Sequence, residues 1–412
     1  PAGGSPRPSG SRMRASAPQA RPTLPILRAQ SAPNSPQRPG TGFANSRPPA
    51  SVAPIISSSG IRKRASKARW RSAESGAEEE RAKRTGRPPG LGAGPSGLAP
   101  AFAAKHFNLD YVVLEQGSLV DAIARFPVNM VFFTTPELME IGGIPLTTPY
   151  DKPTRAEALR YYRKVVDTFQ LQVSLFEKVV AIDPPASPGQ PFVVESHTSR
   201  GVTRTREARN VVLAMGYYEL PNMLNIPGED LPHVSHFYKE AHHYWRQRVV
   251  IVGGKNSAVE AALEIHRAGG HVTMVHRGAG FGESVKYWVK PDIENRVKEG
   301  SIAAHFNASI VEIRPSDVVL DTGVTLPAEG VLLLTGYRAD PEFMTRIGVE
   351  INPETLSPRY NIDTYETNVP GLFVAGGQLA GKRTGTVFIE NGRFHGEVIA
   401  KTLAIRLKAD TT

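Results

Sequence analysis

Two glycine-rich loops lie about 160 residues apart in this chain of 412 residues, and they constrain its fold more than any other feature. The first has the spacing Gly92-x-Gly94-x-x-Gly97, opens an alanine-rich segment and is followed by the apolar run YVVLE. The second lies within RVVIVGGKNSAVEAALEIHRAGGHVTMVHRG, between an apolar run and a helical pattern. Glycine-rich turns that join a strand to a helix are typical of dinucleotide-binding domains. The two loops therefore predict two such domains.

Short apolar runs alternate with helical patterns over residues 91–412. The runs end in small or polar residues, as buried parallel strands do. They read YVVLE, NVVLAMG, RVVIVGG, HVTMVHR, GVLLLTG and GLFVAGG. Helices are expected at Ser96–Phe107, Arg155–Phe169, Ser257–Ala268 and Asn391–Leu407. This alternation predicts the α/β class, with two Rossmann-like three-layer domains.

Composition and charge exclude several classes of protein. The absence of Cys excludes a disulfide framework, a cysteine-ligated metal site and an enzyme that acts through its own thiol. No run approaches the ~18 apolar residues of a membrane helix, so a cytoplasmic protein without a membrane partner is expected. Residues 1–90 carry a net charge of +13 and residues 91–412 a net charge of −3, so the body gives no reason to expect nucleic acid. The histidines at positions 233, 236, 242 and 243 have no zinc-site spacing, and no metal is expected.

Residues 1–86 are rich in Pro, Ser, Ala, Arg and Gly and show no sustained period of 2 or 3.6. Such a segment buries too little apolar surface to offset its ordering entropy, so a disordered tail is expected. Its three interpretations are an organelle transit peptide, a nucleic-acid-binding arm, and an over-extended gene start or frameshift. We favour the third, because the composition changes abruptly near Gly90. In addition, the place of the strand before Gly92 reads KRTGRPPGL, and its two prolines exclude a central strand.

Each part of the first loop has a physical task in binding a dinucleotide. Gly92 makes the tight turn, Gly94 lets the backbone approach a pyrophosphate, and Gly97 lets the helix pack closely on the sheet. The start of the helix supplies amide donors for the phosphates. Glu115 ends the next strand, 18 residues after Gly97, where an acid accepts the ribose hydroxyls of an adenosine.

The second loop predicts an NADPH site. Its strand ends in His276-Arg277 and not in an acid, and an arginine there favours a 2′-phosphate over a free hydroxyl. Lys286 and Lys290 are candidate further cations for the phosphates. The predicted NADPH-binding residues are Gly253, Gly254, Lys255, Asn256, Ser257, Ala258, His276, Arg277, Lys286 and Lys290.

Several longer segments resemble one family of flavoproteins. The closing segment GLFVAGGQLAGKRTGTVFIENGRFHGEVIAKTLA resembles that of thioredoxin-reductase-type proteins with two dinucleotide-binding domains. The segments FPVNMVFFTTPELMEIGGIP, KPTRAEALRYYRKVV, VGGKNSA, SVKYWVKPDIENR and FIENGRFHG are similar to those of the YpdA-type bacillithiol-disulfide reductases. The resemblance covers roughly residues 91–407. It implies FAD and NADPH as cofactors and a low-molecular-weight thiol disulfide, such as bacillithiol disulfide, as substrate.

The resemblance also implies an order of domains. Residues 87–218 and 339–412 are expected to form a discontinuous FAD-binding domain, residues 219–245 a linker, and residues 246–338 an inserted NADPH-binding domain. Hydride passes from NADPH to the flavin, and the dipole of a final helix from near Asn391 stabilises negative charge on the reduced flavin. A homo-oligomer is expected. The predicted flavin site also includes Pro95, Ser96, Gln116, Gly216, Gly336, Gly376, Gly377, Phe388 and Ile389.

Ser96 departs from the family pattern. Better-described members carry Cys at this position, so Ser96 is the catalytic candidate by position only. A hydroxyl does not replace a thiolate nucleophile without a dedicated base. Two alternatives therefore stay open. One is a ferredoxin- or flavodoxin-NADP reductase-like enzyme that reduces a small electron-carrier protein, and the other is a redox-impaired nucleotide-binding homologue.

Overall fold

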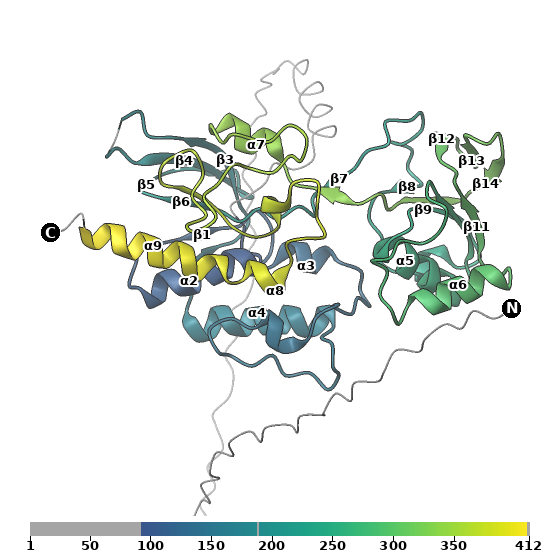
Figure 1. Cartoon of the computed structure of the whole chain (residues 1–412), viewed down its shortest axis with the longest axis horizontal. Helices are drawn as coiled ribbons and strands as arrows, with labels where there is room; N and C mark the ends of the chain where they lie inside the picture. The colour runs from purple at the N-terminus through teal and green to yellow at the C-terminus, as the bar shows by residue number, and fades with distance from the viewer. Residues whose placement is uncertain (1–91, 188, 410–412) are drawn as a thin grey trace, which may run out of the picture. The chain divides into compact units, whose positions relative to one another are not determined.

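The structure is a computed structural model that describes residues 92–187 and 189–409, so the predicted tail and the place of the strand before Gly92 lie outside it. Within these residues, strands and helices alternate as the apolar pattern predicts (Figure 1). The longest helices are α2 (Pro95–His106), α4 (Arg155–Phe169), α5 (Asn256–Arg267) and α9 (His395–Ala409). The last begins later than predicted, because a separate short helix, α8 (Ile389–Gly392), precedes it.

Two pairs of parallel strands flank the first glycine loop. They are β1 (Val113–Leu114) with β2 (Val173–Ser174), and β17 (Leu372–Val374) with β6 (Val211–Leu213). Gly92 lies between the ends of β1 and β6. Its N–H donates to the Leu114 carbonyl at 3.0 Å, and a Cβ on Gly92 would lie 2.4 Å from the carbonyl oxygen of Ala214. Among the described residues no strand joins the two pairs, and Gly92 stands where the loop after a first Rossmann strand stands.

Helices cover these strands and hold the loop in place. Figure 1 shows α2 and α9 side by side, and a Cβ on Gly396 of α9 would lie 2.3 Å from the backbone nitrogen of Pro100 in α2. The start of α4 is fixed locally, since Thr154 and Glu157 form a capping box. Its buried side chains, Tyr162 among them, share one core cluster with Leu98 of α2.

The remaining elements of this part are an antiparallel sheet and short helical turns. The sheet has the order β3 (Glu177–Asp183), β4 (Phe192–Thr198) and β5 (Thr203–Ala208). The short helices are α3 (Asp121–Arg125), η1 (Pro136–Met139), α7 (Pro341–Arg346) and η3 (Gly376–Ala380).

The second loop belongs to a five-stranded parallel sheet. Its order is β11 (Ala303–Phe306), β10 (His271–His276), β9 (Arg248–Val252), β15 (Gly330–Leu333) and β8 (Val234–Ser235). The edge strand β8 comes from the stretch predicted as a linker. Beside this sheet lie α5, α6 (Lys290–Lys298), η2 (His242–Tyr244) and the antiparallel strands β12 (Ile310–Ile313), β13 (Asp317–Leu320) and β14 (Thr325–Pro327). The chain enters and leaves this part through the antiparallel pair β7 (Leu220–Pro221) and β16 (Tyr337–Arg338).

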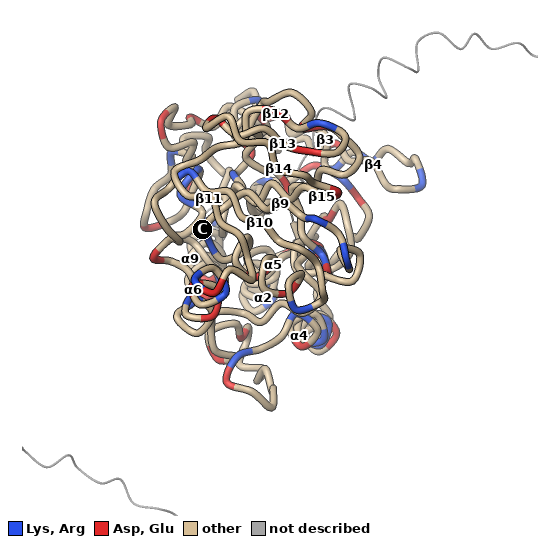
Figure 2. Tube along the Cα trace, turned by 90° about the vertical axis from the view of Figure 1, so that its right-hand side faces the viewer, with Lys and Arg blue, Asp and Glu red and all other residues tan. Residues whose placement is uncertain are grey.

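Acidic and basic positions are interspersed over the described chain, as Figure 2 shows. This distribution agrees with the small net charge of residues 91–412. None of the helices in the described ranges is long and apolar enough to cross a membrane.

Candidate functional site

The first glycine loop has the shape that close approach to a phosphate requires. Gly92 has a φ of +91°, and a Cβ on Gly97 would lie 2.0 Å from the carbonyl oxygen of Gly92, so α2 starts in direct contact with the loop. A Cβ on Gly94 would meet nothing within 4 Å, and no side chain caps α2. The backbone at Gly94 and the start of α2 are therefore open to approach, which fits a pyrophosphate.

Glu115 closes the other side of this loop. One carboxylate oxygen accepts the N–H of Ala93 at 2.6 Å, and the other accepts the N–H of Gly117 at 2.8 Å. Burial raises the pKa of Glu115, which is 6% exposed. The predicted ribose acceptor thus lies at the end of β1, in contact with the glycine loop. Each carboxylate oxygen of Glu115 has a further lone pair, which could accept a hydrogen bond from a ribose hydroxyl.

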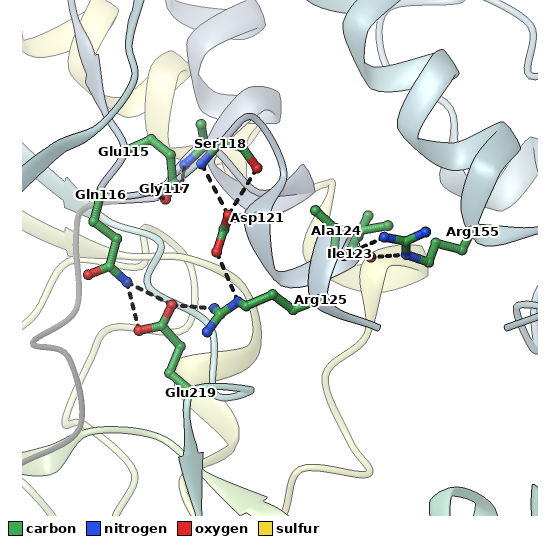
Figure 3. Close-up of polar contacts among 11 residues, drawn as sticks. Glu115, Gln116, Gly117, Ser118, Asp121, Ile123, Ala124, Arg125, Arg155 and Glu219 are labelled. Carbon is green, nitrogen blue, oxygen red and sulfur yellow. Dashed lines mark hydrogen bonds and ion pairs between the residues drawn. The ribbon is translucent and has the colours of Figure 1, made fainter. Parts of the chain in front are cut away.

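Gln116 belongs to a polar network that joins distant parts of the chain (Figure 3). Its amide nitrogen donates to both carboxylate oxygens of Glu219 at 2.7 Å. Arg125 pairs with Glu219 at 2.5 Å and with Asp121 at 2.9 Å. Sequence reasoning missed Arg125 and Glu219, because they are 94 residues apart and neither lies in a recognisable motif.

A small cavity adjoins this network, lined by Met215, Gly216, Tyr217, Glu219, Leu220, Arg338 and Asp340. Gly216 has a φ of +70°, and a Cβ on it would meet nothing within 4 Å. Gly336 does not line this cavity. Its carbonyl accepts the N–H of Asn222 at 2.9 Å, next to the antiparallel pair β7–β16. The structure thus places Gly216 at the cavity and Gly336 at the junction of the two parts.

The C-terminal glycine turn meets the start of α2. Gly376 has a φ of +77°, and a Cβ on it would lie 2.4 Å from Oγ of Ser96. A Cβ on Gly392 would lie 3.0 Å from the same oxygen, and one on Gly377 would lie 2.5 Å from the ring of Tyr217. Glycine is therefore required where Ser96 and the two C-terminal segments come together. This junction is how residues nearly 300 positions apart form one predicted flavin site.

Phe388 and Ile389 follow the same segment but differ in exposure. Phe388 is 50% exposed, while Ile389 packs against the core cluster that contains Leu98. The predicted pair is thus split between solvent and core at the start of α8.

The second loop brings His276 against its glycines. Gly253 has a φ of +140°, and a Cβ on it would lie 2.6 Å from the carbonyl oxygen of Leu334. A Cβ on Gly254 would lie 2.6 Å from the imidazole of His276, so the ring covers the backbone of the loop. Ala258 is buried where α5 packs on Gly253. These contacts place the end of β10 directly beside the start of α5.

Three cationic or titratable side chains gather at this point. Burial, with the positive charges of Arg277 and Lys255, lowers the pKa of His276. Arg277 and Lys255 are exposed, and neither has an ion-pair partner among the described residues. Ser257 is also exposed, in the first turn of α5. The cluster suits an anionic group such as a phosphate.

Asn256, Lys286 and Lys290 are used differently. The side chain of Asn256 accepts the N–H of Lys286 at 2.8 Å and donates to the carbonyl of Ser284 at 2.9 Å. The buried ammonium of Lys286 pairs with Glu260 at 2.6 Å and donates to the carbonyl of Val131 at 3.0 Å. Lys290 lies 4.0 Å from Glu294 on α6. The charge of Lys286 is thus satisfied within the protein, which leaves Lys255 and Arg277 as the accessible cations of the cluster.

No group of three or more His, Cys, Asp or Glu side chains in residues 92–187 and 189–409 is placed to hold a metal ion. His236 instead lies 3.4 Å from Glu229 and is half-buried, and burial lowers its pKa.

Comparison with known proteins agrees with this geometry. Residues 91–376 match the family described as pyridine nucleotide-disulphide oxidoreductase. The chain is 41% identical over 320 residues to the bacilliredoxin reductase Bdr of Bacillus subtilis (strain 168), a match that covers 77% of this chain and 97% of that protein.

Solved structures give the same picture. The bacillithiol disulfide reductase Bdr (YpdA) of Bacillus cereus has a TM-score of 0.74 and 40% identity, over 76% of this chain and 97% of that one. A thioredoxin reductase of T. acidophilum shares the fold at a TM-score of 0.60 and 18% identity, over 77% of this chain and 97% of that one. The predicted fold class and the resemblance seen in the sequence motifs are confirmed.

Proposed function

The chain belongs to the pyridine nucleotide-disulphide oxidoreductase family, and on that premise we propose that it is an FAD-containing enzyme that uses NADPH to reduce the disulfide of a low-molecular-weight thiol. Family membership makes it an oxidoreductase that uses a flavin and a nicotinamide nucleotide. Bacillithiol disulfide is the substrate that the names of its relatives favour. The observation that carries the finer assignment is the pairing of two glycine loops that each start a helix. The first is open at Gly94, and the second is lined by Lys255, His276 and Arg277.

The two loops suggest a division of labour between the two parts of the chain. We assign FAD to residues 87–218 and 339–412, and NADPH to residues 246–338, with residues 219–245 between them. The polar contacts around Glu219 and the β7–β16 crossing support a junction at residues 219–222 and 336–338.

The residues of the first site fit FAD. Gly94 and the uncapped start of α2 would hold the pyrophosphate, Glu115 would accept ribose hydroxyls, and Gly376 and Gly377 would bring backbone close to the flavin. The side-chain amide of Gln378 donates to the carbonyl of Leu213 and accepts the N–H of Met215. It therefore stabilises the turn and does not bind the ligand. When bound, FAD supplies the two-electron chemistry that no side chain of this protein offers.

The residues of the second site favour NADPH over NADH. Arg277 and Lys255 have no ion-pair partner among the described residues and could pair with a 2′-phosphate, and the imidazole of His276 lies against Gly254 of the loop. A carboxylate that would accept a free 2′-hydroxyl does not end β10.

Disulfide reduction in this chain uses no protein thiol, because the sequence contains no Cys and Ser96 occupies the family's cysteine position. One hydride from NADPH and one proton convert a disulfide, RSSR, to two thiols, RSH, and leave NADP⁺. Ser96 is held between Gly376 and Gly392, and no basic side chain among the described residues hydrogen-bonds to its hydroxyl, so it contributes shape to the junction and no nucleophile. The higher identity to the bacillithiol-linked relatives favours a thiol disulfide over ferredoxin as the acceptor.

The test is to purify the full chain, record its visible spectrum, and follow NADPH oxidation after addition of bacillithiol disulfide, glutathione disulfide or ferredoxin. We expect a flavin spectrum that NADPH bleaches and that bacillithiol disulfide restores. Ser96→Ala is expected to keep this activity within about threefold, since its hydroxyl performs no covalent step. Arg277→Glu is expected to weaken the binding of NADPH, and Lys298→Glu, a charge reversal on the exposed end of α6, is its matched control.

Three results would contradict the proposal. Absence of bound flavin would remove its basis, and bleaching by NADPH without recovery on bacillithiol disulfide would refute the substrate. Loss of activity in Ser96→Ala alone would show that the hydroxyl takes part in the chemistry.

A further inference from the structure

His395 is a buried histidine to which the proposed function gives no role. It begins α9 and is 7% exposed, and its ring stacks on Tyr365 with centroids 4.3 Å apart and 22° between the planes. Its Nδ1 accepts a hydrogen bond from the backbone N–H of Gly376 at 3.1 Å. An imidazole that accepts at Nδ1 is neutral and carries its proton on Nε2. Burial lowers the pKa of His395 to about 4, which maintains this neutral form at pH 7.

The bonded amide belongs to the turn that meets Ser96. Two buried side chains hold this turn. Gln378 donates to the carbonyl of Leu213 at 2.6 Å and accepts the N–H of Met215 at 3.1 Å, which ties the turn to the end of β6. His395 ties Gly376 to the start of α9.

The position of the turn depends on the hydrogen bond from Gly376 to His395, because the amide of Gly376 is buried. A buried amide without an acceptor loses its hydrogen bond and regains none from water. The chain would then move to find a partner. Gly376 is in close contact with Ser96, since a Cβ on Gly376 would lie 2.4 Å from that side chain. A shift of the turn therefore changes its contact with the first glycine loop.

We propose that His395 is a positioning residue of the flavin site, whose Nδ1 holds the Gly376–Gly377 turn against Ser96 at the start of α2. This inference rests on the proposed function, because the ligand whose site is positioned is FAD. His395 acts through Gly376 and reaches the ligand site only by way of that turn.

Two substitutions separate the acceptor from the ring. His395→Asn keeps an acceptor, since the Oδ1 of asparagine can occupy the position of Nδ1, but it loses the ring that stacks on Tyr365. His395→Phe keeps a ring of similar size at the same place but has no acceptor. Flavin-free protein of each variant and of the parent chain is titrated with FAD, and flavin fluorescence gives the dissociation constant. The absorption spectrum of the bound flavin is recorded in parallel.

If Nδ1 positions the turn, His395→Phe should bind FAD roughly tenfold more weakly than the parent chain, with an altered flavin spectrum, while His395→Asn stays close to the parent. The opposite order, with His395→Asn the weaker binder, would show that the ring serves packing and would overturn the inference. Equal weakening in both variants would also overturn it, because keeping the acceptor in His395→Asn would then give no advantage. A parent chain that binds no FAD would refute the proposed function and not this inference. Deuterium exchange of the Gly376 amide in the flavin-free proteins then decides, with faster exchange expected in His395→Phe alone.

Discussion

Glu177 is the buried charge whose removal should cost this protein most. It lies in β3, and its side chain is fully buried. Its carboxylate accepts hydrogen bonds from four side chains, one on β2 and three on β4 and β5. These donors are Ser174 at 2.6 Å, Ser196 at 2.5 Å, Arg204 at 2.9 Å and Arg206. Although burial works in the opposite direction, the donors together hold the pKa of Glu177 at about 2, below its ordinary value of 4.5.

The size and sign of the effect follow from that pKa. Each unit of lowering corresponds to about 1.4 kcal/mol, so the depressed pKa contributes roughly 3 kcal/mol to the free energy of unfolding at pH 7. Because the pKa of the folded state is the lower one, this contribution is complete above about pH 5 and is lost as the pH falls from about 5 to 2. Glu177→Gln, which removes the charge at every pH, should therefore lower stability by about 3 kcal/mol at pH 7 and by much less near pH 3.

Urea unfolding followed by tryptophan fluorescence at constant ionic strength, between pH 3 and 7, measures this difference. The matched control is Glu195→Gln on β4, because the side chain of Glu195 is 45% exposed and its ion-pair partner among the described residues is the exposed His197 at 3.1 Å. It should change stability by less than about 0.5 kcal/mol at any pH. A gap between the parent chain and Glu177→Gln that stays constant from pH 7 to pH 3 would refute the linkage argument.

Three further predictions concern the two nucleotide sites. Arg277→Glu should weaken NADPH binding roughly ten- to a hundredfold and leave NADH binding nearly unchanged. Titration followed by nucleotide fluorescence measures both affinities, and an unchanged NADPH affinity would show that another group holds the 2′-phosphate. Gly376→Ala, at a φ of +77° and with Ser96 only 2.4 Å from the new Cβ, should lower the melting temperature and the flavin content, whereas Gly385→Ala, in open space, should change neither. An apolar strand, DVVIV, placed directly before Gly90 in place of the Arg/Pro run should tighten FAD binding and raise the melting temperature, because β1 and β6 could both pair with it. No gain in either measurement would show that a strand before Gly92 does not limit FAD binding.

Local sequence signals were sufficient for most of the elements. The helix Arg155–Phe169 has the predicted bounds, because its capping box of Thr154 and Glu157 is a signal within one turn of chain. The loop–helix–strand unit that begins at Gly92 and the strand–loop–helix unit around Gly253 could be predicted because the glycine spacing and the apolar periods both lie within about 30 residues. The cation cluster at the end of β10 was predictable for the same reason, since Arg277 directly follows the strand.

Tertiary structure alone decided which polar groups meet. Lys286 was predicted as a cation for phosphate, yet its ammonium is bonded to Glu260 and to the carbonyl of Val131, 155 residues away. The Arg125–Glu219 pair and the His395–Gly376 bond have no sequence signature either. Periodicity reports which face of an element is buried, but the partner of a buried polar group depends on how separate elements pack together. The start of the final helix at His395, and not near Asn391, has a local cause instead: the side chain of Asn391 accepts the N–H of Phe388 and donates to the carbonyl of Thr386, which caps the start of the separate short helix α8.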